Sequence, residues 1–146
     1  MSLFFGGEKK EAVLFSPLEG KLTLNGKSAS GAKITLWLAW KDKEGEYHHF
    51  SADEAGHFSI PAQIAIYKES PLLQISIGQT ITVDYEGREY LIWRAGKTTT
   101  TLYGELGGRP KNVTCELSDP EMNPYLEHAL LETLCKWEKL DMDAVN

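Results

Sequence analysis

Side chains that could bind a metal ion are few in this sequence and poorly spaced for the task. The histidines are His48, His49, His57 and His128. His48 and His49 are neighbours on a predicted strand, so they point to opposite faces and cannot easily bind one ion. His49 and His57 could approach each other across a hairpin near Asp53, but a metal site needs three or four converging ligands. We therefore interpret the histidines as solvent-facing strand residues and predict neither metal ligands nor a cofactor.

The other motifs that carry chemistry lack the context that the chemistry requires. Cys115 and Cys135 do not have the C-x-x-C spacing of a zinc site. The glycine-rich segment 104–109 follows a strand-like run, but it does not open a helix as a phosphate-binding loop would. No Gly-x-Ser-x-Gly motif occurs, and no Ser, His and Asp constellation can be assembled. The sequence therefore predicts a protein that is not an enzyme and has no catalytic residues.

Charge is distributed unevenly along the 146 residues. From Glu116 onward lie eight of the 21 acidic residues but only two of the 15 basic ones, Lys136 and Lys139, so this stretch carries the whole net charge of −6. Nucleic-acid binding depends largely on Lys and Arg, and an acidic segment argues against it. The acidic segment suits a basic protein partner, or serves solubility alone.

The sequence predicts neither a secretory leader nor a membrane-spanning segment. The apolar run before Gly6 is only three residues long, Leu3 to Phe5, whereas a secretory signal has an apolar core of about 7–15 residues and a spanning helix needs about 18. We expect a cytoplasmic protein that does not bind membranes, with signal-independent export left open. Cytosolic thiols normally stay reduced. A disulfide between the two cysteines is the alternative in an oxidising compartment.

Alternating apolar residues between turn motifs predict a mainly β protein. The expected strands are 12–16, 18–24, 32–40, 46–51, 57–60, 80–85, 88–94, 98–103 and 112–117. The apolar runs 63–68 and 72–77 are left open between strand and other structure, and a single helical turn is the alternative for 63–68. Asn25-Gly26 and Glu86-Gly87 have the residues of two-residue hairpin turns. The run 32–40 is apolar on both faces, with Leu36 on one and Trp37 on the other. It is therefore expected to be a central strand that is covered on both sides.

The C-terminal segment has the pattern of an amphipathic helix. Residues 118–121 fit a capping box, and Asn123-Pro124 offers a second helix start. An apolar stripe at helical spacing follows, formed by Leu126, Leu130, Leu134, Trp137 and Leu140. Glu132 and Lys136 are spaced to pair at i and i+4. We predict a single domain over residues 1–146, with a β-sandwich at 12–117 and a helical segment at 118–142 that covers the central strand.

The first half resembles the carboxypeptidase regulatory-like domain, a member of the transthyretin-like, or prealbumin-like, sandwiches. The shared features are Gly20, Asn25-Gly26, Gly31-Ala32, the alternation of 34–38 and the segment Asp-Glu-Ala-Gly-His-Phe at 53–58. The resemblance covers about residues 12–60, and Ser51 and Ala52 replace the usual threonine. It implies a seven- to eight-stranded antiparallel β-sandwich with a structural or interaction role. The second half resembles small bacterial proteins encoded near type VI secretion genes.

The first resemblance implies a non-enzymatic protein–protein interaction module. The second implies a role as an immunity or accessory protein for a type VI secretion effector or spike component. The predicted partner site is a small apolar spot with an acidic rim on the far side of the helix, a layout typical of interfaces. Its residues are Glu127, Leu131, Glu132, Cys135 and Glu138. Its partner would be a basic secreted effector or a secretion component.

The alternative is a carbohydrate- or cell-envelope-binding module that uses aromatic side chains of the strands as a stacking platform. The candidates are Trp37, Trp40, Tyr47, Phe50, Tyr85, Tyr90, Trp93 and Tyr103. Such residues more often pack the core, and Trp37 and Trp40 are expected to be buried.

Overall fold

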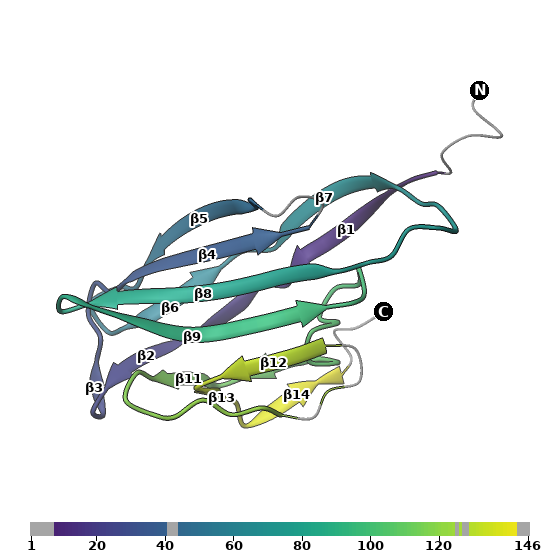
Figure 1. The fold of residues 1–146 in the computed structure, drawn as a ribbon. Coiled ribbons are helices and arrows are strands. Elements are labelled where there is room, and N and C mark those ends of the chain that lie inside the picture. The colour runs from purple at the N-terminus through teal and green to yellow at the C-terminus, as the bar shows by residue number, and fades with distance from the viewer. Residues whose placement is uncertain (1–7, 41–43, 125, 127–128, 143–146) are drawn as a thin grey trace.

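The computed structural model describes residues 8–40, 44–124, 126 and 129–142, which form strands β1 to β14 and no α-helix (Figure 1). The prediction of a mainly β protein is confirmed. No helix in these residues is long and apolar enough to cross a membrane.

The larger sheet is antiparallel, with the strand order β12-β9-β8-β4-β5. Its strands are β4 (Lys33–Ala39), β5 (Glu46–Ser51), β8 (Ile77–Tyr85), β9 (Arg88–Lys97) and β12 (Ala129–Thr133). Glu86 and Gly87 close the β8–β9 hairpin with φ angles of 50° and 76°. Two successive left-handed residues give the turn the twist that matches its strands, as the sequence predicted.

The second sheet has the order β13-β11-β2-β3, and β6 also pairs with β2. Its strands are β2 (Leu18–Leu24), β3 (Lys27–Ser28), β6 (His57–Ile60), β11 (Val113–Glu116) and β13 (Cys135–Lys136). Strand β11 runs parallel to β2, with Val113 opposite Gly20. Two short two-stranded ribbons complete the fold. One pairs β1 (Lys9–Phe15) with β7 (Gln63–Lys68), and the other pairs β10 (Arg109–Lys111) with β14 (Lys139–Asp141).

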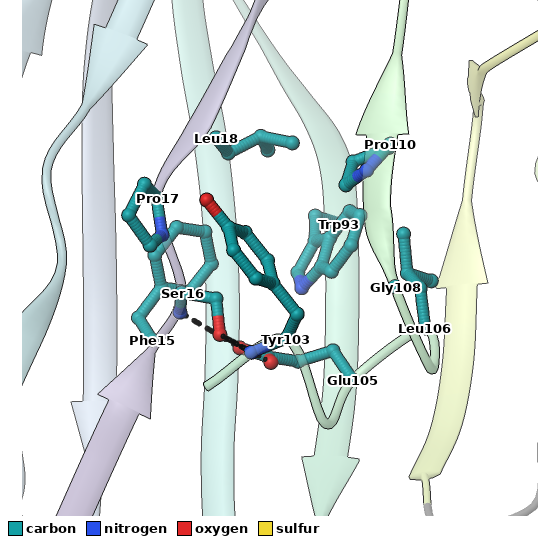
Figure 2. A pocket seen from close by; sticks show the side chains of 10 residues that line it. All are labelled: Phe15, Ser16, Pro17, Leu18, Trp93, Tyr103, Glu105, Leu106, Gly108 and Pro110. Atoms are coloured by element: carbon teal, nitrogen blue, oxygen red, sulfur yellow. Dashed lines mark hydrogen bonds between the residues drawn. The ribbon is translucent and has the colours of Figure 1, made fainter. Parts of the chain in front are cut away.

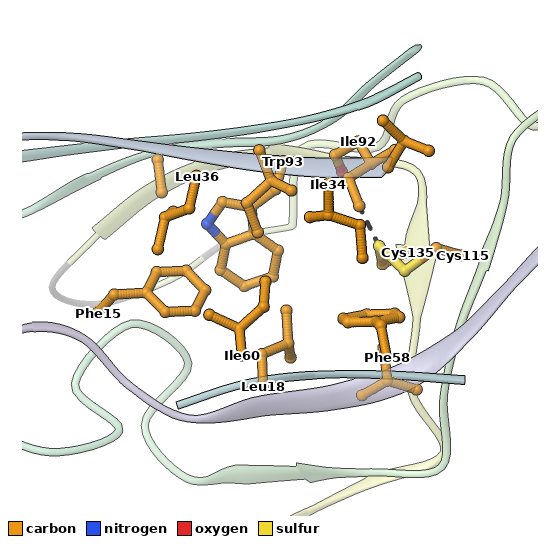
Figure 3. Close-up of a cluster of buried hydrophobic side chains, with 14 of the residues drawn as sticks. Phe15, Leu18, Ile34, Leu36, Phe58, Ile60, Ile92, Trp93, Cys115 and Cys135 are labelled. Atoms are coloured by element: carbon orange, nitrogen blue, oxygen red, sulfur yellow. Dashed lines mark hydrogen bonds between the residues drawn. A yellow bond between two sulfur atoms is a disulfide. The ribbon is translucent and has the colours of Figure 1, made fainter. Parts of the chain in front are cut away.

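The core lies between the two sheets and receives side chains from both (Figure 3). The large sheet contributes Ile34, Leu36, Ile92 and Trp93, and the second sheet contributes Leu18, Phe58 and Ile60. Phe15 of β1 meets Trp93 edge-on, with ring centroids 6.2 Å apart. This two-layered packing is consistent with the predicted sandwich.

Strand β4 is central, because β5 and β8 pair with its two edges. Its inner face, with Leu36, is buried as predicted, whereas Thr35 and Trp37 on the outer face are only half-buried. The prediction that both faces are covered is therefore wrong. The described residues place no second layer on the outer face, and the predicted helix that was to supply it does not form.

The predicted C-terminal helix is replaced by strands β12, β13 and β14. In β12, Ala129, Leu131 and Thr133 point inward and are buried, while Leu130 is 83% exposed. Backbone pairing of β12 with β9 overrides the local helical pattern, because tertiary contacts outweigh the small differences in helix propensity.

The side-chain pair expected on the helix is also absent. Glu132 lies 2.6 Å from Arg94 of β9, and Lys136 lies 3.3 Å from Asp119. Glu132 and Lys136 therefore each pair with a residue distant in the sequence and not with each other, as they would on one face of a helix.

Several strand predictions are confirmed with the same bounds, namely 18–24, 46–51 and 57–60. The run 63–68, which the sequence left open between a strand and a helical turn, is strand β7. Residues 98–103 form turns and irregular chain instead of a strand, and the run 72–77 is irregular up to Ile77, where β8 begins. The predicted last strand is β11, but three further strands follow it.

Candidate binding surfaces

The described residues of the predicted partner site do not form one surface. Leu131 is buried at 4% exposure, and Cys135 is fully buried. Glu132 is held by Arg94, as described above. Glu138 accepts a hydrogen bond of 2.7 Å from the Asn112 side chain, and Glu127 lies outside the described residues. The predicted site depended on the helix and is lost with it.

Cys115 and Cys135 are joined by a disulfide. They lie directly opposite each other on β11 and β13 and are fully buried beneath the large sheet (Figure 3). Sequence reasoning left this pairing open. The register of two strands decides it, because it places both side chains on the inner face.

The most chemically unusual cluster is a buried polar network around Glu105 (Figure 2). Its carboxylate accepts hydrogen bonds from the backbone N–H of Ser16 (2.9 Å), from the Ser16 hydroxyl (2.7 Å) and from the Gln79 amide (2.9 Å). Lys97 Nζ lies 3.3 Å from the same carboxylate. Gln79 in turn accepts a 3.0 Å hydrogen bond from the Trp93 indole.

Lys97 completes this network from β9. Its ammonium group donates to the carbonyls of Val13 (2.7 Å) and Thr101 (2.8 Å). Burial lowers the pKa of Lys97, while the nearby Glu105 carboxylate opposes that shift. The network ties the segment after β9 to β1 and β8. Every member has partners, and such a network rigidifies a fold.

A cavity beside this network is too small for a substrate. Its volume is about 20 Å³, and Phe15, Trp93 and Tyr103 are among the residues that line it (Figure 2). That space suits one water molecule. Sequence reasoning did not find Lys97 and Glu105, although one signal was present. Lys97 lies two and four residues after the buried Ala95 and Trp93 on the same strand, so its side chain points to the same inner face.

The β1–β7 ribbon carries exposed apolar side chains. Ile64 and Ile66 of β7 are 53% and 60% exposed, although isoleucine is usually buried. They lie opposite Val13 and Glu11 on the same face of the ribbon, and Lys68 lies opposite Lys9. In Figure 1 the ribbon forms the end of the molecule nearest the N-terminus. No other described strand pairs with β7.

The outer face of the large sheet is hollowed into a shallow groove of about 550 Å³. It is lined by Thr35, Trp37, Tyr47, His49, Thr80, Thr82, Asp84 and Glu89. Trp37 and Tyr47 lie directly opposite each other on β4 and β5, and Tyr47 is 63% exposed.

The remaining aromatic candidates do not join this platform. Trp93 is buried, Phe50 points to the inner face of β5, and Trp40 packs edge-on against Tyr67 with ring centroids 5.6 Å apart. The expectation that Trp37 and Trp40 are buried is wrong, since both are half-buried.

The histidines have local roles where they are described. His49 Nδ1 lies 3.2 Å from the Thr35 hydroxyl, and His57 lies 3.9 Å from Asp53. Within residues 8–40, 44–124, 126 and 129–142, no three His, Cys, Asp or Glu side chains gather as a metal site. His128 lies outside these ranges.

Comparison of the sequence and structure with known proteins identifies a family but no curated protein or solved structure that is significantly similar. Residues 18–120 match the family described as "Domain of unknown function (DUF6795)". Neither the curated proteins nor the solved structures contain a significant match to the chain. The match runs from the first residue of β2 to beyond β11, and so includes the central strands of both sheets. Because it covers more than half of the sequence, the chain belongs to the DUF6795 family.

Proposed function

We propose that this protein is a non-enzymatic interaction module that binds an extended segment of a partner protein along β7. The observation that carries the proposal is the pair of exposed isoleucines, Ile64 and Ile66, beside the edge of β7 with which no described strand pairs. Proteins usually protect such edges, because the free N–H and C=O groups invite another strand to pair. Adding a strand to an open edge is a recurring mode of peptide recognition.

Two hydrogen bonds identify the backbone groups that face the free edge. The N–H of Glu69 donates to the carbonyl of Glu8, so this pair faces inward across the ribbon. The N–H of Val13 donates to Thr100, away from β7. Because inward and outward pairs alternate in an antiparallel ladder, the N–H and C=O groups of Ile64, Ile66 and Lys68 point outward.

The side chains along the edge restrict what the partner segment can be. Lys9 and Lys68 lie directly opposite each other, and no described residue forms a salt bridge with either. Two neighbouring lysines favour an acidic residue in the partner. The isoleucines favour apolar residues at alternate positions of the added strand. An acidic partner segment takes the place of the basic partner that the acidic helix had suggested.

A specific role follows from the resemblances noted in the sequence. The fold is proposed to be transthyretin-like in its first half, as the pattern of residues 12–60 indicates. The resemblance of the second half to proteins encoded near type VI secretion genes makes an effector or spike component the first partner to test. The role would then be that of an immunity or accessory protein.

Hydrogen exchange tests the proposed edge at single residues. In the free protein, the amides of Ile64, Ile66 and Lys68 should exchange quickly, while those of Ala65 and Tyr67 should be protected by β1. Adding an effector or spike protein encoded beside the gene should slow exchange at the outward amides. An unchanged exchange pattern on β7 in a demonstrated complex would contradict the proposal.

A proline substitution separates backbone pairing from side-chain contact. Ile66→Pro removes an outward N–H and leaves the ladder with β1 intact, since proline is tolerated on edge strands. It should abolish binding, whereas Ile66→Val should retain it. Should Ile66→Pro unfold the ribbon, Ile66→Lys tests the same edge. Leu72→Ala, at a side chain that is 91% exposed but off the strand, is the matched control.

A further inference from the structure

We propose that the groove on the outer face of the large sheet binds an oligosaccharide that carries free amino groups. This site is separate from β7 and does not depend on the function proposed above. Three features of the groove carry the inference, and they are an aromatic pair at one end, a carboxylate pair at the other and hydroxyl groups between them.

The aromatic pair is held ready for stacking. The Trp37 indole N–H donates a 3.0 Å hydrogen bond to the Glu44 carbonyl. Gly45 has a φ of 69°, and a Cβ there would lie only 2.7 Å from Trp37 Nε1, so the ring is packed closely against bare backbone. Tyr47 lies opposite and is largely exposed. A ring fixed before binding loses little entropy when a sugar stacks on it.

The carboxylate pair gives the groove its charge preference. Asp84 and Glu89 lie directly opposite each other on β8 and β9, and like charges in that position destabilise a sheet. Neither forms an ion pair with a described residue, and the residues that line the groove include no Lys or Arg. Lys33 of β4 lies directly opposite Asp84, and its ammonium group lies 3.3 Å from the Ser51 hydroxyl. An ammonium group on the ligand would relieve the repulsion through charge-assisted hydrogen bonds.

The floor between the two pairs is polar and of suitable length. Thr35, Thr80 and Thr82 place hydroxyl groups there, and hydroxyls both donate and accept hydrogen bonds. Asp84 lies opposite Lys33 of β4, which is four residues from Trp37 on the same strand. The two ends of the groove are therefore roughly 13 Å apart at the usual strand rise. This length exceeds a single pyranose ring. A protein interface core would instead be apolar and poor in charge.

Titration calorimetry with three oligosaccharides of equal length tests the proposal. The probes are the glucosamine hexamer, which is cationic, cellohexaose, which is neutral, and hexagalacturonate, which is anionic. The glucosamine hexamer should bind most tightly, and its affinity should fall as salt rises. Hexagalacturonate should not bind. Tyr47→Ala removes one stacking contact, and the double substitution Asp84→Asn with Glu89→Gln removes both charges. Each should weaken binding by about tenfold or more.

Two matched controls complete the design. Leu130→Ala removes an exposed side chain from the same sheet face but outside the groove, and Ile66→Lys alters the β7 edge, so both should bind the glucosamine hexamer normally. Absence of binding, equal affinity for cellohexaose, or full affinity in a folded Tyr47→Ala variant would each overturn the proposal. Loss of a protein partner on Tyr47→Ala, without any glycan binding, would reassign the face to protein recognition and would equally overturn it.

Discussion

Leu130 and Leu131 are neighbours in the chain but have opposite surroundings, since Leu130 is 83% exposed and Leu131 is 4% exposed. Truncating the buried one should therefore destabilise the protein far more. We expect Leu131→Ala to lower the free energy of unfolding by about 2–5 kcal/mol, as in other packed cores. Leu130→Ala should change it by less than about 0.5 kcal/mol. Urea titration of both variants checks this, and equal losses would contradict the strand assignment of β12.

The pair formed by Lys97 and Glu105 is buried, so breaking it should be costly. Glu105→Gln leaves the Lys97 ammonium without its carboxylate, and we expect a loss of about 3–5 kcal/mol in unfolding free energy. The double variant Lys97→Met with Glu105→Gln should lose less than the sum of the single variants, because no unpaired charge remains. Glu19→Gln, at an exposed glutamate, is the control. Additive losses in the double variant would show that the two side chains do not interact.

Glu116 should make the stability depend on pH in acid. Desolvation raises the pKa of this carboxyl group, but hydrogen bonds from the Ser118 hydroxyl and from the backbone of Ser118, Gly26 and Asn25 outweigh it and lower the pKa from 4.5 to about 2. A lowered pKa in the folded state means that the group stabilises the protein above about pH 4.5. This contribution is lost as the pH falls through about 2.

Glu116→Gln is the variant that isolates this effect. Between about pH 5 and pH 2, the urea concentration at the unfolding midpoint should fall further for the parent protein than for the variant. The same acid-induced loss in both proteins would remove Glu116 as its source. The hairpin turn at Asn25 and Gly26, which Glu116 holds through two backbone N–H groups, is the element expected to loosen first.

The Cys115–Cys135 disulfide should contribute substantially to stability. It closes a segment with a sequence separation of 20 residues, and cross-links of that span stabilise proteins by about 3 kcal/mol. Reduction, or the variant Cys135→Ser, should lower the unfolding free energy by about that amount in a denaturant titration. Reductant should have no effect on the Cys135→Ser variant. Mass spectrometry of alkylated protein from the native cells would tell whether the bond forms there, which a reducing cytoplasm would prevent.

Local signals predicted most of the β structure well. Turn residues such as Asn25-Gly26 and Glu86-Gly87 act within a few residues, and their positive φ angles are observed as expected. The bounds of β2, β5 and β6 followed from alternation, from Pro17 before β2 and Pro61 after β6, and from the turn residues that flank β5. These features depend on neighbours in the sequence, so sequence reasoning can reach them.

The C-terminal strands were missed because their cause is not local. Leu130 is apolar but exposed, and Thr133 is polar but buried and bonded to the Ile92 carbonyl, so the period of two was hidden beneath a helical one. The predicted partner site failed for the same reason. Likewise, the Ile-Ala-Ile run of β7 is apolar but fits either a strand or a helical turn, and its exposure depends on which elements pack nearby. No local pattern contains that information.

The parallel pairing of β2 with β11 cannot form until late in translation. Gly20 pairs with Val113, which is translated 93 residues later. At typical synthesis rates of about 5–20 residues per second, that delay is roughly 5–20 s. During this time one edge of β2 lacks its neighbour and can pair wrongly. We expect nascent chains released before Glu116 to be substrates for chaperones and proteases, however well their first hairpins have formed.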